Sequence, residues 1–204
     1  MKTIINIGRQ FGSGGKSVAL ALGEKLGIKV YDGELLNRAA QESGFSREFF
    51  EKNDESRSLF TLSGLFDSAR FGSADNYVGG NTLFSIQSDV IRSIAEKESA
   101  IFVGRCSDYI LRDMDCVNVF ICAPEEFRVA AVCKRSGLDT EAAAELMRKK
   151  DRRRETYYNY HTFGNWGVAS NYHLCIDSSV LGVDGTVDMI IGYCNKRGLS
   201  GGQK

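Results

Sequence analysis

Five short apolar runs along the chain have the length and composition of buried β-strands. They are rich in β-branched and aromatic residues and lack the polar alternation that marks a strand with one solvated face. The runs cover residues 4–7, 28–31, 100–103, 116–122 and 173–177. Unbroken runs of this kind are typical of parallel strands that are covered on both faces.

The segments between these runs carry apolar residues at the spacing of amphipathic helices. Gly27 follows the first segment as a natural C-terminal residue, Gly137 separates two others, and the single proline, Pro124, stands where a helix begins. The predicted helices cover residues 16–26, 33–43, 82–98, 125–136, 139–157 and 183–196. This alternation predicts an α/β fold in which helices cover both faces of a five-stranded parallel sheet.

The length and composition indicate one domain. The chain has 204 residues, of which 43% are hydrophobic, enough for a single sizeable core over residues 1–204. Residues 45–80 break the pattern with scattered aromatics and no sustained period, and we interpret them as a moving flap on the substrate side. A surface excursion with its own small apolar cluster is the alternative. Residues 198–204 are predicted to form a flexible tail.

The charges argue against polyanionic partners. Twenty-six basic and twenty-six acidic side chains cancel, so no global field attracts nucleic acid or an anionic membrane. No apolar run has the length of a membrane span, and the N-terminus enters a strand without a signal-peptide pattern. We therefore expect a cytoplasmic protein, as a monomer or a homodimer.

The cysteines show no metal-binding spacing. The six cysteines form no C-x-x-C pair, and the chain has two histidines. A zinc site is not expected on this pattern, and the thiols are interpreted as reduced and mostly buried.

A glycine-rich segment between the first strand and the first helix predicts a phosphate-binding loop, here called the phosphate loop (residues 10–17). Glycines allow the backbone to wrap closely around a phosphate, and the helix N-terminus adds partial positive charge. Lys16 can then reach the β and γ phosphates of a nucleotide, and Ser17 can ligate Mg²⁺. The match to G-x-x-x-x-G-K-[ST] departs at Gln10, where the first glycine belongs.

Polar side chains follow two further strands at their carboxyl ends, where open α/β sheets bind ligands. Asp32 follows the second strand, and Arg38 lies on the helix after it. Arg105 leaves the third strand and is expected to point into the same crevice as Lys16. The alternative is that these arginines are ordinary surface cations.

The sharpest charge feature is the run of residues 148–154, six cations around one carboxylate, Asp151. With the aromatic loop that follows, it is interpreted as a lid over residues 148–171 that closes on phosphates, because such enzymes need arginines on the transferring group. A solvated helix face and a nucleic-acid patch are the alternatives.

These motifs together resemble the cytidylate kinase-like branch of the nucleoside monophosphate kinases. The matching blocks are GRQFGSGGKS, YDGELL, FVGRCSDYIL and RRRETYYNYHTFGNW. The resemblance implies a three-layer α/β/α P-loop NTPase fold with an acceptor-binding flap and a lid. It also implies ATP and Mg²⁺ as cofactors and a small-molecule acceptor, most directly CMP or dCMP.

The resemblance implies a role for each candidate residue. The loop residues Gly12, Ser13, Gly14, Gly15, Lys16 and Ser17 would hold ATP. The acceptor would be bound by Asp32, Arg38, Arg92 and Arg105. Lys16, Arg105, Asp151, Arg153 and Arg154 would serve catalysis, and Ser17 would hold the metal.

Three positions depart from the family pattern. Cys106 replaces an aspartate associated with pyrimidine recognition, Gly33 replaces a serine, and Met147 replaces a lid arginine. The family's phosphate-binding residues are thus retained, while its residues at the positions that recognise base and sugar are not. A kinase of a different small acceptor, or a non-catalytic nucleotide-binding module, are the remaining alternatives.

Overall fold

The five predicted strands form one parallel sheet in the order β2-β3-β1-β4-β5. The computed structural model describes residues 2–42 and 77–199, so residues 45–76 of the predicted flap lie outside the described residues. The strands are β1 (Ile4–Arg9), β2 (Lys29–Tyr31), β3 (Ala100–Val103), β4 (Val117–Cys122) and β5 (Leu174–Asp177). The strand order leaves β1 at the centre of the sheet, so the phosphate loop begins from its middle.

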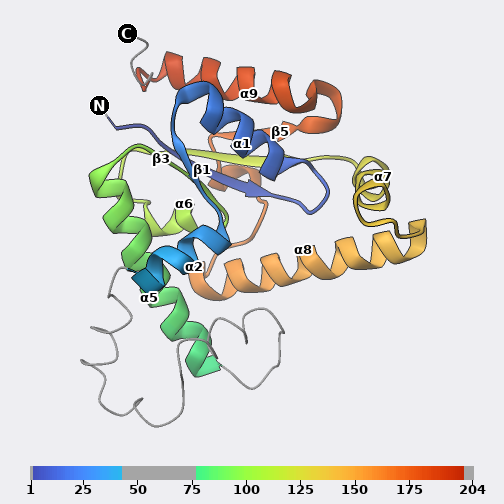
Figure 1. Ribbon diagram of the computed structural model, residues 1–204, viewed down its shortest axis with the longest axis horizontal. Helices are drawn as coiled ribbons and strands as arrows, with labels where there is room; N and C mark the ends of the chain where they lie inside the picture. Colours follow the sequence, from blue (N-terminus) through green and yellow to red (C-terminus); the bar gives the residue numbers. More distant parts are fainter. Residues whose placement is uncertain (1, 43–76, 200–204) are drawn as a thin grey trace.

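Helices cover both faces of the sheet, which confirms the predicted three-layer α/β/α fold (Figure 1). One layer holds α1 (Gly15–Leu26) and α9 (Ser178–Lys196), and the other holds α2 (Gly33–Glu42), α5 (Tyr77–Lys97) and α6 (Ser107–Ile110). The remaining helices are α7 (Glu125–Ser136), α8 (Thr140–Thr162) and a short 3-10 turn at Ala169–Asn171. In Figure 1, α8 passes below the loop that follows β1.

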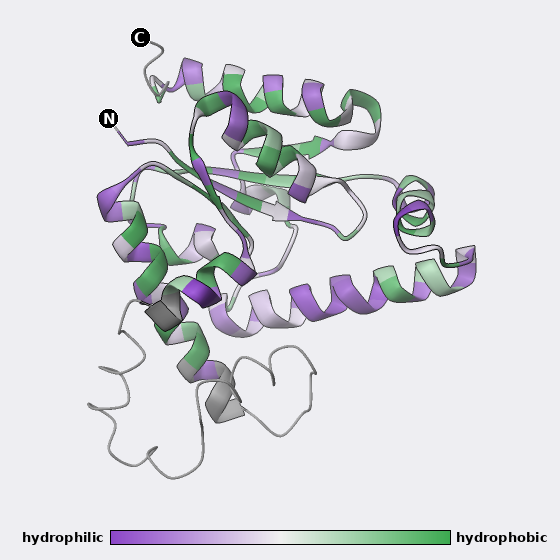
Figure 2. Ribbon diagram, in the orientation of Figure 1, coloured by the Kyte–Doolittle hydropathy of each residue, from purple (hydrophilic) through white to green (hydrophobic). Residues whose placement is uncertain are grey.

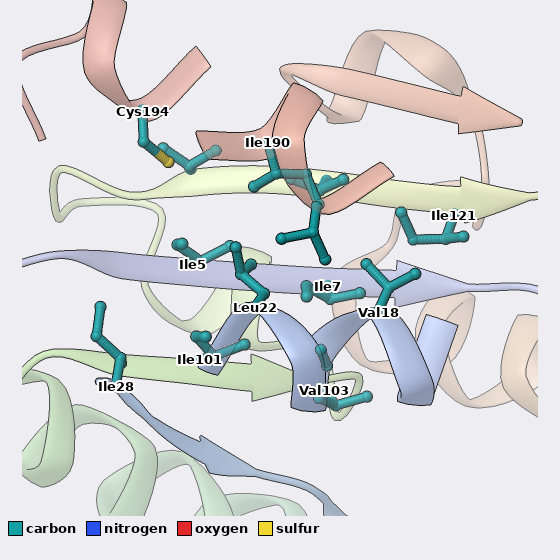
Figure 3. Close-up of a cluster of buried hydrophobic side chains, with 14 of the residues drawn as sticks. Ile5, Ile7, Val18, Leu22, Ile28, Ile101, Val103, Ile121, Ile190 and Cys194 are labelled. Atoms are coloured by element: carbon teal, nitrogen blue, oxygen red, sulfur yellow. The ribbon is translucent and has the colours of Figure 1, made fainter. Parts of the chain in front are cut away.

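The side chains of β1 alternate between two apolar clusters. Ile5 and Ile7 are fully buried against α1 and α9, together with Leu22 and Ile190, as Figure 3 shows. Ile4 faces the opposite cluster, beside Ile91 on α5 and Phe102 on β3. Burying one such side chain stabilises a fold by about 1.5–3 kcal/mol, so the sheet is a rigid base for the loops at its edge.

Hydrophilic residues gather on one helix away from these clusters. Figure 2 shows that the middle of α8 is strongly hydrophilic, in contrast to the apolar strands. This is the segment that contains the basic run. No helix among the described residues combines the length and apolar character that crossing a membrane requires.

Several boundaries differ from the sequence prediction. Helix α5 begins at Tyr77 rather than at residue 82. Helix α9 begins at Ser178 rather than at residue 183, and a non-helical residue, Gly182 (φ 63°), separates its first turn from the predicted part. The short elements α6 and Ala169–Asn171 were not predicted. Leu199, placed in the flexible tail by the sequence, is buried, and its carbonyl accepts a hydrogen bond from the Thr3 hydroxyl at 2.7 Å.

A histidine helps to join the end of the chain to the sheet. His173 Nδ1 accepts a hydrogen bond from the Asn118 backbone N–H at 2.9 Å, so this nitrogen must be unprotonated. Arg197 lies beside the other ring nitrogen and donates to Asp115 at 2.8 Å. Burial, and then the charge of Arg197, lower the pKa of His173, and burial lowers that of His161.

We expect the stability of the fold to decrease as the pH falls below about 6.5, the ordinary histidine pKa. Because both histidine pKa values are lowered, the unfolded chain binds more protons than the folded one in that range. Urea unfolding at pH 7.5 and pH 5.5 tests this expectation. A His173→Asn variant, whose side-chain oxygen can still accept a hydrogen bond, should lose less stability between the two pH values; an unchanged loss would contradict it.

Candidate active site

The phosphate loop connects the centre of the sheet to the N-terminus of α1. Gly12 and Gly14 have left-handed backbones (φ 86° and 75°), and Gly14 is the residue on which α1 is capped. A Cβ at Gly12 would lie 2.7 Å from the carbonyl oxygen of Arg128, so the position has no room for a side chain. The free N–H groups of the first turn of α1 give the loop the donors that an anion site needs.

Gln10 replaces the first glycine of the motif without opening the loop. Its side-chain oxygen accepts a hydrogen bond from the Ala123 N–H at 3.1 Å, and its own N–H donates to the Ile121 carbonyl at 3.0 Å. Ser13 donates its hydroxyl to the Gln10 and Ile121 carbonyls, at 2.9 and 3.1 Å. Both side chains therefore attach the loop to the end of β4.

Lys16 and Asp32 are brought together across the crevice. Lys16 Nζ lies 2.8 Å from Asp32 Oδ2, and 66% of the lysine side chain is exposed. The other oxygen of Asp32 accepts the first backbone N–H groups of α2, from Glu34 and Leu35. Burial opposes ionisation of Asp32, but the hydrogen bonds from Lys16 and these two N–H groups outweigh it and lower its pKa.

Arg105 lies on three consecutive left-handed residues at the end of β3. Gly104, Arg105 and Cys106 have φ values of 75°, 61° and 56°. The two non-glycine residues are uncommon in this region, which indicates a turn held by its surroundings. The Arg105 guanidinium lies against Gly33, where a Cβ would be 2.8 Å from Nε and from Nη2. The same guanidinium lies 5.8 Å from the centre of the Tyr157 ring. Arg105 thus occupies the space that a serine at position 33 would need.

Asp151 and Arg128 hold the phosphate loop from outside. Asp151 Oδ1 accepts the backbone N–H of Phe11 at 2.6 Å, and Arg128 Nη1 donates to the Phe11 carbonyl at 3.3 Å. The two side chains form an ion pair at 2.6 Å and are 16% and 10% exposed. Asp151, predicted as catalytic, is therefore a ligand of the loop backbone in this structure.

Arg154 is the cation of the basic run that reaches the loop. Its Nη1 donates to the carbonyl of Arg9 at 3.1 Å and lies 3.4 Å from Asp151 Oδ1. The guanidinium also lies 5.4 Å from the centre of the Phe11 ring. Burial lowers the pKa of Arg154, and Asp151 acts in the opposite direction. Helix α8 thus presents a fixed cation to the loop.

The other predicted residues are not joined to this cluster by contacts within the described part of the chain. Arg92 is exposed and lies 3.6 Å from Asp89 on its own helix, and Arg38 and Arg153 are exposed. Ser17 is exposed on the first turn of α1. In residues 2–42 and 77–199, no group of three or more His, Cys, Asp and Glu side chains could hold a metal ion.

Two residues that depart from the family pattern, Cys106 and Met147, are buried in the packing of the fold. Cys106 is 3% exposed, and burial raises the pKa of its thiol, which makes it unreactive. Met147 is 1% exposed and packs with Val129, Val132 and Ala143 between α7 and α8.

Sequence reasoning missed two arginines, Arg9 and Arg128. Arg128 donates to backbone carbonyls of Phe11 and Ala123, and backbone partners leave no residue pattern that a motif could match. Arg9, the last residue of β1, carries a weak signal, because it stands directly before the phosphate loop. It is a charged residue at the end of a strand that is otherwise uncharged.

Comparisons with known sequences identify the family of the chain. The family described as "Cytidylate kinase-like family" matches residues 4–180. The chain is 26% identical over 185 residues to the cytidylate kinase of Archaeoglobus fulgidus, covering 88% of each chain. It is 27% identical over 200 residues to the cytidylate kinase of Methanopyrus kandleri, covering 93% of this chain and 92% of the relative.

Solved structures share the fold. An uncharacterised protein from Eubacterium ventriosum is 30% identical with a TM-score of 0.72, covering 95% of this chain and 99% of that one. Shikimate kinase from Bacteroides thetaiotaomicron is 11% identical with a TM-score of 0.52, covering 95% and 98%. At this identity the second likeness concerns the fold alone.

We expect Arg128→Met to lower the free energy of unfolding by about 3 kcal/mol, because it removes the closest cation from a largely buried carboxylate. Urea unfolding measures the loss. The matched control is Arg148→Met, which breaks the exposed pair with Glu125 between the same two helices and should cost below about 1 kcal/mol. Equal losses in the two variants would contradict the role assigned to Arg128.

Proposed function

Because the chain belongs to the cytidylate kinase-like family of P-loop kinases, we propose that it transfers the γ-phosphoryl group of ATP to a nucleoside monophosphate, CMP or dCMP. The observation that carries this proposal is that cations from three separate elements lie near the start of α1. Lys16 pairs with Asp32, Arg105 acts on Arg9 at the end of β1, and Arg154 donates to the Arg9 carbonyl. Cations gathered at a helix N-terminus favour a ligand with several phosphates.

The donor phosphates would lie on the first turn of α1. The N–H groups of Gly14, Gly15 and Lys16 would receive them, with the Lys16 ammonium beside the outer phosphates. Lys16 would exchange its contact with Asp32, 2.8 Å away, for a phosphate oxygen. An exposed lysine can make this change with little loss of packing.

The Ser17 hydroxyl suits Mg²⁺, because this ion prefers oxygen ligands and commonly takes one or two from the protein, with the rest from phosphates and water. Ser17 is exposed on the turn that would carry the phosphates. When bound, the ion would supply neutralisation of charge on the β and γ oxygens.

The acceptor monophosphate would lie on the opposite side of the crevice. Arg105 would bind its phosphate, and Asp32 would accept hydrogen bonds from its sugar or base. Arg38 and Arg92, which are exposed on α2 and α5, would reach the acceptor when the flap closes. Arg153 would follow Arg154 onto the transferring group with the lid.

The transfer needs no general base. An oxygen of the acceptor phosphate is already anionic, so it attacks the γ-phosphorus directly while the bond from phosphorus to the ADP oxygen breaks and its electron pair stays on ADP. The protein contributes positioning and stabilisation of charge on the three peripheral oxygens.

A second acceptor class is supported by one observation. Cys106, at the position associated with pyrimidine recognition, is a buried thiol of raised pKa and offers no strong hydrogen-bond partner to a base. A site without that contact would accept other small phosphorylated molecules, because much of the discrimination between polar ligands comes from such buried partners.

The first test is ADP formation from Mg-ATP with CMP, dCMP, UMP, AMP and GMP. We expect turnover with CMP or dCMP, and a loss of about 10²–10³-fold in kcat for Lys16→Ala. Lys25→Ala removes an exposed lysine that lies on the same helix as Lys16 and pairs with Asp188 of α9, and it should retain activity. ATP binding without turnover on any acceptor would contradict the proposal.

We expect Gly33→Ala to raise the KM for the acceptor with little change in the KM for ATP. The new Cβ would lie 2.8 Å from the Arg105 guanidinium, which must then move from the acceptor side. Steady-state kinetics measures both values, with each substrate varied in turn at a saturating concentration of the other. Gly192→Ala on α9 is the matched control, because its Cβ meets nothing within 4 Å; equal KM values in both variants would refute the assignment.

A further inference from the structure

Arg9 occupies a space that two glycines keep open. It ends β1 on the same face as Ile5 and Ile7, and its side chain runs past the first turn of α1 toward the end of β3. A Cβ at Gly15 would lie 2.6 Å from Arg9 Cβ, and a Cβ at Gly104 would overlap Arg9 Nη1. The guanidinium therefore lies between the phosphate loop and the turn that carries Arg105.

No carboxylate neutralises this guanidinium at close range within residues 2–42 and 77–199. Asp32 and Asp151 act on it from a distance, but Asp32 is paired with Lys16 and Asp151 with Arg128. Two cations, Arg154 and Arg105, also act on it. Burial first, and then Arg154 and Arg105, lower the pKa of Arg9.

Such an arrangement is unfavourable in the protein alone. A partly buried cation among cations is stabilised only when anionic charge enters the space between them. The space lies between the donor side, at Gly15, and the acceptor side, at Gly104 and Arg105. Under the proposed function, a phosphoryl group would pass between these two sides.

We propose that Arg9 is a catalytic residue that binds the phosphoryl group in transfer, through its guanidinium, between the phosphate loop and Arg105. This rests on the proposed function. Arg9 supplies an enclosed cation on this side, whereas Lys16 is two-thirds exposed and directed toward Asp32. A guanidinium can bind two oxygens of one phosphoryl group at once, which an ammonium cannot do in the same plane.

The first variants are Arg9→Met and Arg9→Lys, assayed with the acceptor that the panel identifies. We expect kcat to fall about 10²–10³-fold in Arg9→Met and to recover little in Arg9→Lys. The melting temperature of Arg9→Met should be unchanged or higher, because a poorly compensated charge is removed. A wild-type kcat in Arg9→Met, or a lost fold that Arg9→Lys restores together with full activity, would overturn the proposal.

A double-mutant cycle tests the geometry. Gly104→Ala should displace the guanidinium and lower kcat, yet lower it no further when Arg9 is already methionine. Gly137→Ala is the matched control for strain, because this glycine is also left-handed (φ 68°) with nothing within 4 Å. The same loss from Gly104→Ala in both backgrounds would overturn the proposal.

Nucleotide binding separates this inference from the proposed function. Calorimetry with Mg-ATP and Mg-ADP needs no acceptor, and Arg9→Met should weaken ATP about tenfold more than ADP, since the γ-phosphoryl loses a charged donor. An unchanged ratio of ATP affinity to ADP affinity in Arg9→Met would overturn the role of Arg9, even if the wild-type protein phosphorylates an acceptor. A reduced ratio supports that role, even if the protein phosphorylates no nucleoside monophosphate in the panel.

Discussion

The phosphate loop depends on the fixation of one residue, Phe11. Its N–H is accepted by Asp151 and its carbonyl is bound by Arg128, and these two side chains form an ion pair at 2.6 Å. Because both come from helices that follow β4, the position of the loop depends on contacts with the second half of the chain. The basic helix α8 is placed by the same contacts, so one ion pair sets the distance between the loop and the cation Arg154 that faces it.

The repulsion among the cations at the carboxyl edge of the sheet lowers the stability of the fold, and the rest of the fold must offset this loss. The central strand β1 is buried on both faces, and its apolar residues stabilise the sheet from which the loop begins. With that support, Arg9, Arg105 and Arg154 remain close together without enough carboxylates among them. A preorganised site of this kind binds phosphates strongly because its dipoles and charges do not need to rearrange when the charge arrives.

The sequence predicted the strands and most helices because each depends on local pattern: apolar runs, helical spacing, and left-handed glycines at Gly27 and Gly137. It also placed Lys16 and Asp32 at the carboxyl ends of strands in a parallel sheet, but the ion pair between them appears only in the structure. It could not predict the fixation of Phe11, whose partner Asp151 is 140 residues away and binds a backbone atom. Arg9 was missed for the same reason, since the space it fills is defined by the absence of side chains at Gly15 and Gly104.

The departures from the family pattern follow from packing in this structure. The Arg105 guanidinium and a serine at position 33 cannot share the same space. The buried side chains of Cys106 and Met147 offer ligands nothing polar, whereas the residues around the loop keep free donors and positive charge. Under the proposed function, an acceptor in this crevice would be held mainly by its phosphate. Asp32, a carboxylate whose lowered pKa keeps it a hydrogen-bond acceptor, would then be the polar side chain left to select among acceptors.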